Sequence, residues 1–198
     1  MRKLLAITAA LMIGSLAAAS SSAANTKIFD PATKTWMEIG PGAHSGKSPI
    51  RKKVVSYYGH QKPGTIIIDT GERRLYYVMD KGRAMKYGID FGREGFQWAG
   101  IKHVARKAEW PGWNPPRQMV AREHRKGRKL PAYMEGGPNN PLGARAMYLG
   151  GSLYRIHRSN EPWTIGQAVS SGCIRMANDD VIDLYDRVEA GAKVIIKH

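Results

Sequence analysis

The single cysteine of this chain, Cys173, stands in the stretch SSGCIRM, residues 170–176. A thiolate is a strong nucleophile, but an ordinary thiol is only slightly ionised at neutral pH and needs a nearby base or cation. His157 lies 16 residues upstream and is the histidine nearest to Cys173 in sequence. The pair predicts acyl transfer through a thioester, whereas the alternative for Cys173 is a small buried side chain without chemistry.

The residues around the cysteine fit this chemistry. Gly172 allows a sharp backbone bend, and the N–H groups of residues 171–173 could point at a developing oxyanion. Arg175 has two interpretations: it lowers the thiol pKa and holds a substrate carboxylate, or it pairs with Asp179 or Asp180 at the start of the next helix. We favour the first, and we assign these aspartates to the helix start and its solvated face.

Other common kinds of site find little support. One cysteine cannot form a thiolate zinc site, and the six histidines show no HExxH-like spacing. The glycine-rich stretch GGPNNPLG lacks both the dinucleotide-binding spacing and the lysine of a P-loop. We therefore expect neither a metal nor a cofactor.

The start of the chain reads as a secretory signal peptide over residues 1–24, with Arg2 and Lys3 before an apolar run and small residues at its end. In an oxidising compartment a lone cysteine has no internal partner for a disulfide. The formal charge of +15, or +13 without Arg2 and Lys3, favours envelope polymers or anionic lipid head groups as partners, or simply a soluble surface. Nucleic acid is not expected, since no recognition motif is present.

The remaining chain divides into an extended basic arm, residues 25–61, and one folded domain, residues 62–198. Runs rich in β-branched and aromatic residues, separated by turn residues, predict strands at 64–70, 73–79, 84–91 and 193–197. The middle, residues 92–143, is rich in Gly, Pro and Trp and is interpreted as functional loops or a lid.

A hairpin and a helix frame the cysteine. Two runs, 144–149 and 152–157, are joined by Gly150-Gly151, which predicts a hairpin with a tight two-residue turn. A short helical stretch is expected after Pro162, and residues 178–188 predict a helix capped by Asn178. The expected fold is mainly β, with short helices and a loop-rich middle.

The ordered pattern resembles the signature of the L,D-transpeptidase catalytic domain family, and the similarity extends over about residues 62–198. The matching positions are His157, Gly166, Ser170, Gly172, Cys173 and Arg175. The resemblance implies a β-sandwich or barrel-like domain in a periplasmic enzyme of a Gram-negative envelope that remodels peptidoglycan. This chain departs from many members at two positions, with Ser171 in place of histidine and Arg158 in place of glycine.

The resemblance also implies roles for single residues. Cys173 would attack the third-residue carbonyl of a donor tetrapeptide stem and release D-alanine, with His157 as base and then acid. The backbone carbonyl of Arg158 would orient His157, and the backbone of Ser171 and Gly172 would form the oxyanion site. Substrate binding would fall to Ser170 and Arg175.

Three functions stay open at this point. A transpeptidase would pass the acyl group to an amine, either of diaminopimelate in a 3-3 crosslink or of a lysine in an envelope protein such as an outer-membrane lipoprotein. A hydrolytic relative, a carboxypeptidase or amidase, would use water instead, and the choice depends on how well the site excludes water. A non-catalytic peptidoglycan-binding module is the alternative from another class, and it has no need of the Cys–His pair.

Overall fold

The computed structural model describes residues 26–30, 35–39, 48–92, 99–168 and 172–198. The signal peptide predicted for residues 1–24 lies outside these residues. The elements are β1 (Thr26–Asp30), β2 (Thr35–Ile39), β3 (Lys53–Ser56), β4 (Ile66–Asp69), β5 (Arg74–Met79), β6 (Arg83–Gly88), β7 (Gly100–Glu109), α1 (Arg117–Arg125), β8 (Arg145–Leu149), β9 (Arg155–Arg158), the 3-10 turn η2 (Pro162–Thr164), β10 (Ile174–Met176), α2 (Asn178–Arg187) and β11 (Lys193–Lys197). Strands dominate, so the prediction of a mainly β fold is confirmed.

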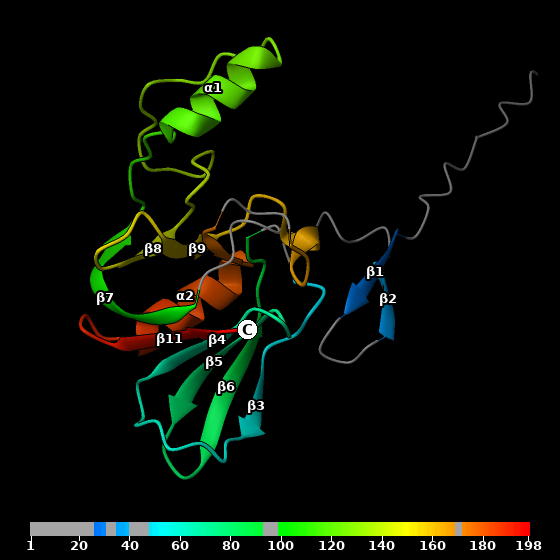
Figure 1. The fold of residues 1–198 in the computed structure, drawn as a ribbon, viewed down its shortest axis with the longest axis vertical. Helices are drawn as coiled ribbons and strands as arrows, with labels where there is room; N and C mark the ends of the chain where they lie inside the picture. Colours follow the sequence, from blue (N-terminus) through cyan, green and yellow to red (C-terminus); the bar gives the residue numbers. More distant parts are fainter. Residues whose placement is uncertain (1–25, 31–34, 40–47, 93–98, 169–171) are drawn as a thin grey trace, which may run out of the picture.

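Nine strands form one curled sheet in the order β10-β9-β8-β7-β11-β4-β5-β6-β3 (Figure 1). The pairs β9–β10 and β4–β11 are parallel, and the other neighbours are antiparallel. A separate hairpin, β1–β2, and the edge strand β3 both come from the predicted N-terminal arm. Part of the predicted arm therefore forms strands, and one of them, β3, pairs with the main sheet; the boundary at residue 62 stays a prediction.

Helix α2 fills the hollow of the curled sheet (Figure 1). Val181 and Leu184 of the helix, and Val188 directly after it, are fully buried in the same core cluster as Ile66 of β4 and Met147 of β8. Each buried aliphatic side chain of this kind contributes about 1.5–3 kcal/mol to folding. The helix thus joins the two halves of the sheet and fixes the position of β10, which ends two residues before it.

Two predictions about local structure are corrected. The hairpin β8–β9 forms, but Leu149 N–H donates to the carbonyl of Tyr154, so the loop spans residues 150–153 rather than two glycines. Asn178 is the first residue of α2 and not its cap; the residue before the helix is Ala177, and no side chain caps the helix.

The middle of the chain is also more regular than its composition suggests. Residues 92–143 contain the ten-residue strand β7 and the nine-residue helix α1. Strand β7 pairs with β8 on one side and β11 on the other, so its backbone bonds hold it although only Val104 is buried. Helix α1 buries no residue and projects away from the sheet (Figure 1).

Candidate active site

Cys173 and His157 line the same cavity, of about 490 Å³. One wall is formed by residues of β9 and β10 and the segment before β10, and the other by Trp113 and by Met119, Arg122 and Glu123 of α1. The predicted lid is therefore an ordered cap that carries a helix. Trp113 is buried in the wall, whereas Trp110 is 46% exposed.

The parallel pairing of β9 with β10 explains how two residues distant in sequence meet. Arg175 lies opposite His157 in this register, and Cys173, one residue before β10, continues it opposite Arg155. Side chains at alternate positions of a strand point to the same face, and paired strands lie about 4.8 Å apart. All four residues accordingly line the cavity, as a two-by-two array of Cys173, Arg155, His157 and Arg175.

The glycine before the nucleophile has the conformation that its predicted role requires. Gly172 has φ of +100°, a region that disfavours other residues. A Cβ at this position would also lie 2.5 Å from the Cε1 atom of Tyr154. The bend that presents Cys173 to the cavity therefore depends on glycine.

Burial controls the ionisation of the pair. His157 is 7% exposed, and its burial lowers its pKa to about 3, helped by the charges of Arg155 and Arg175. Burial raises the pKa of Cys173. This rise is opposed by the Arg155 guanidinium, by a hydrogen bond from the Arg155 backbone and by the charge of Arg175. At neutral pH the resting pair is thus a neutral imidazole beside a protonated thiol.

The ring of His157 has weak support from its surroundings. The backbone carbonyls of Arg158 and Pro141 lie near the ring and favour its protonated form. Nevertheless, Nδ1 makes no hydrogen bond of standard geometry with the described residues. The orienting role of the Arg158 carbonyl stays a prediction.

The Arg158 side chain does not reach the cavity. Its Nη1 donates to the carbonyl of Pro138 at 3.2 Å, and its methylenes pack where a Cβ of Gly143 would lie. The long side chain at this position therefore supports the turn at 138–143 and leaves the cavity open.

Arg175 pairs with neither of the aspartates considered from the sequence. Its Nε donates to Asp90 Oδ2 at 2.9 Å, its Nη2 binds the same oxygen, and Nη1 lies 3.6 Å from Glu161 Oε2. Asp90 is fully buried and also accepts a hydrogen bond from Thr164. Arg175 is thus a fixed cation in the cavity wall rather than a partner of α2.

The two aspartates occupy different environments. Asp180 is buried, which corrects its assignment to a solvated face, while Asp179 is exposed. Ser170 and Ser171 lie outside the described residues, so their assigned roles stay predictions.

Arg155 is the main site residue that the sequence analysis missed. It lines the cavity, and its buried Nε has no hydrogen-bond partner among the described residues. The available signal was its position two residues before His157, which places both side chains on one face of a strand. Its pairing with Cys173 depends on the β9–β10 register, which no local pattern reveals.

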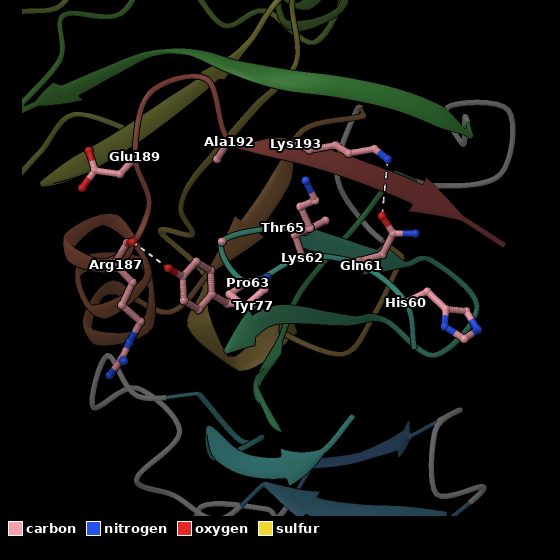
Figure 2. Close-up of a pocket in the computed structure, with 11 residues that line it drawn as sticks. His60, Gln61, Lys62, Pro63, Thr65, Tyr77, Arg187, Glu189, Ala192 and Lys193 are labelled. Carbon is pink, nitrogen blue, oxygen red and sulfur yellow. Dashed lines mark hydrogen bonds between the residues drawn. The ribbon is translucent and has the colours of Figure 1, made fainter. Parts of the chain in front are cut away.

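A second cavity, of about 560 Å³, lies elsewhere in the molecule (Figure 2). Tyr77 donates its hydroxyl to the carbonyl of Arg187 at 2.8 Å, and Lys193 Nζ donates to Gln61 Oε1 at 3.3 Å. Neither Cys173 nor His157 reaches this cavity. The predicted catalytic pair therefore lies in the cavity below α1 and not in this one.

No group of three or more His, Cys, Asp or Glu residues in the described ranges is placed to hold a metal ion.

Comparison with known proteins agrees with this geometry. A probable L,D-transpeptidase of Escherichia coli K12, ErfK/SrfK, is 38% identical over 136 residues, which cover 66% of this chain and 43% of the relative. A solved Brucella melitensis structure, described as a probable carnitine operon oxidoreductase, is 44% identical, with a TM-score of 0.50, covering 78% of this chain and 98% of that one. A mutant of the Enterococcus faecium L,D-transpeptidase shares the fold at 19% identity, with a TM-score of 0.54, covering 69% and 50% of the two chains.

The alignment thus spans less than half the length of the E. coli relative. Residues 63–196 match the family described as the YkuD L,D-transpeptidase catalytic domain, which is more than half of this chain. The chain belongs to the L,D-transpeptidase catalytic domain family.

Proposed function

We propose that this protein is a peptidoglycan L,D-transpeptidase with Cys173 as nucleophile and His157 as general base. The observation that carries the proposal is the array of Cys173, His157, Arg155 and Arg175 in one cavity wall. It unites a nucleophile, a neutral base and two fixed cations, the parts that acyl transfer from an anionic peptide requires.

The reaction proceeds in two halves. The Cys173 Sγ attacks the third-residue carbonyl of the donor stem while its proton passes to His157, giving a tetrahedral oxyanion. The oxyanion collapses, the bond to the D-alanine nitrogen breaks, and His157 returns the proton to this leaving amine. An acceptor amine then attacks the thioester, loses a proton to His157 and expels the Cys173 thiolate, which is reprotonated.

The remaining roles follow the shape of the site. The backbone N–H groups of Ser171, Gly172 and Cys173 would donate to the oxyanion, which concentrates stabilisation where charge develops. Arg175, together with Ser170, would bind the donor stem. Arg122 and Arg128 also line the cavity, where both contact Glu123. Four arginines against two glutamates in the lining leave an excess of positive charge, which suits the carboxylates of the stem.

The acceptor and the cellular setting belong to the same proposal. The acceptor is the amine of a second stem, giving a 3-3 crosslink, or a lysine of an envelope protein such as an outer-membrane lipoprotein. We place the mature enzyme in the periplasm after removal of residues 1–24. In the described residues, no helix is long and apolar enough to cross a membrane.

Other activities have less support. An oxidoreductase, as the Brucella protein is named, is not favoured by a sequence that lacks the dinucleotide-binding fingerprint. A hydrolytic relative would share the acyl-enzyme and differ only in its acceptor. Product analysis with purified tetrapeptide stems separates the two, since a crosslinked dimer forms only in the transpeptidase.

Intact mass spectrometry after incubation with a carbapenem, a reactive acyl donor, tests the nucleophile. The wild type should gain one adduct, Cys173→Ala none, and His157→Ala an adduct at a rate reduced by about 10²–10⁴-fold. An unmodified wild type, or the same adduct on Cys173→Ala, would refute the assignment.

A further inference from the structure

We propose that the segment Ser48–Lys52, here called the strap, positions the loop and helix that hold Cys173 at both ends. The strap lies outside residues 63–196, which match the family, so the family comparison assigns it no role. The inference deepens the proposed function, because it concerns the geometry of the same nucleophile.

In the middle of the strap, Ile50 covers Gly166 of the segment that leads to the nucleophile. A Cβ added to Gly88 would lie 2.7 Å from Cβ of Ile50, and one added to Gly166 would lie 2.8 Å from its Cδ1. Both distances are shorter than real Cβ contacts, so the two glycines leave room for this one side chain. The glycine at position 166 therefore serves close packing with the strap as well as its own φ of +96°.

Gly166 is an anchor of the catalytic loop. Its N–H donates to the carbonyl of Ile89 at 2.9 Å, and its carbonyl accepts a hydrogen bond from Arg73 Nη1 at 2.8 Å. The preceding residue, Ile165, is fully buried. Gly166 lies seven residues before Cys173, and residues 169–171 between them lie outside the described part of the chain. The hydrogen-bonded position of Gly166 is the described contact through which Ile50 would act on the nucleophile.

At the last residue of the strap, Lys52 contacts the helix that follows the nucleophile. Its Nζ lies 3.5 Å from Asp183 Oδ1 and 3.9 Å from Asp180 Oδ1 on α2. Helix α2 starts five residues after Cys173. The strap thus contacts the chain on both sides of the nucleophile, before it through Ile50 and after it through Lys52.

The sheet holds the strap itself in place. Strand β3 begins directly after Lys52 and pairs with β6 along its whole length. Ile50 N–H also donates to Ser48 Oγ at 3.1 Å. Ile50 and Lys52 are therefore positioning residues on a fixed support, and neither lines the catalytic cavity.

The test compares Ile50→Ala and Lys52→Gln with matched controls from the adjoining strand. Val54→Ala removes a side chain that is 49% exposed, and Lys53→Gln removes a lysine for which the described residues offer no ion pair. Two readouts are needed: the limiting rate and half-saturating concentration of carbapenem acylation, and amide hydrogen exchange of peptides 161–168 and 172–180. Exchange does not depend on the activity, so it tests the strap even if the wild type is not acylated.

We expect Ile50→Ala to lower the limiting acylation rate about tenfold at an unchanged half-saturating concentration, because small misplacements of a nucleophile are costly. In Ile50→Ala, amide hydrogen exchange should become faster in peptides 161–168 and 172–180 and stay unchanged in β4 and β11. Ile50→Val should restore most of the acylation rate. Lys52→Gln should speed amide hydrogen exchange of peptide 172–180, and it keeps the test decisive if Ile50→Ala fails to fold. Unchanged exchange in both variants, or equal losses in the controls, would overturn the proposal.

Discussion

Replacement of the buried Asp180 by asparagine should change how stability depends on pH. Burial raises the pKa of Asp180 from 3.8 to about 6; Lys52 opposes this rise, while Asp183 and Asp179 add to it. The folded protein therefore binds a proton at this carboxyl more tightly than the unfolded chain does. Its free energy of unfolding should increase as the pH falls from above 6 to below about 4.

The size of the effect follows from the same shift. A difference of about two pKa units corresponds to about 3 kcal/mol, which is present below pH 4 and is lost as the pH rises through 6. Asp180 is 6% exposed, so screening by solvent reduces this value little. Asp183 acts in the opposite direction and in another window, because its hydrogen bonds from Arg187 and Tyr87 and the charge of Lys52 overcome burial and lower its pKa to about 2.

Urea unfolding at pH 4.5, 5.5, 6.5 and 7.5 measures the effect in wild type and Asp180→Asn. The wild type should gain stability relative to the variant as the pH falls, by about 2 kcal/mol between pH 7.5 and 4.5, because the last part of the shift appears only below pH 4. Asp186→Asn, on the exposed face of the same helix, controls for loss of a helix charge. A stability difference between wild type and Asp180→Asn that stays constant with pH would refute the reasoning.

Three further predictions concern the array and its support. Because burial lowers the pKa of His157 to about 3, the carbapenem acylation rate should be flat from pH 5 to 8 in stopped-flow measurements, and an inflection near 6.5 would contradict this. Arg155→Gln should move the pH dependence of iodoacetamide alkylation of the catalytic thiol to higher pH, with alkylation at pH 8 several-fold slower. Arg155 and the exposed Arg106 both stack on the ring of Tyr148, so Arg106→Gln is a matched control and should leave the alkylation profile unchanged. Asp90→Asn should cost about 3–5 kcal/mol in urea unfolding by leaving the Arg175 cation poorly paired, and adding Arg175→Met should recover part of the loss.

The sequence predicted those elements whose side chains are buried in a regular pattern. Residues 66–69 are all buried, and the apolar face of α2 repeats with helical spacing, so both stood out. Strand β7 buries only Val104, and its stability comes from backbone pairing on two sides. Helix α1 buries nothing and is basic, and its only apolar residues are Met119, Val120 and Ala121, so neither element offers the run of buried apolar side chains that predicts structure from sequence.

In the candidate site, too, the residues of a local motif could be predicted and those brought in by tertiary pairing could not. Cys173, His157 and Gly172 belong to a local motif, and the structure places the first two in one cavity and gives the third its positive φ. Arg155 lies beside Cys173 only because of the parallel register of β9 and β10, and Asp90 binds Arg175 from 85 residues away. Contacts of this kind depend on tertiary pairing, which residue types and spacing do not encode.

The two arginines that lower the cost of a thiolate at Cys173 also raise the cost of an imidazolium at His157. Arg155 and Arg175 favour ionised Cys173 but disfavour protonated His157, and burial disfavours both charges. Proton transfer in the empty cavity is therefore unfavourable, which keeps the lone thiol protonated and less open to oxidation. In the proposed reaction a donor stem would change this balance, because its carboxylates would compensate the arginine charges beside His157 while its carbonyl accepts the attack of the sulfur. The reactive ion pair is thus expected to form together with the tetrahedral intermediate rather than before substrate arrives.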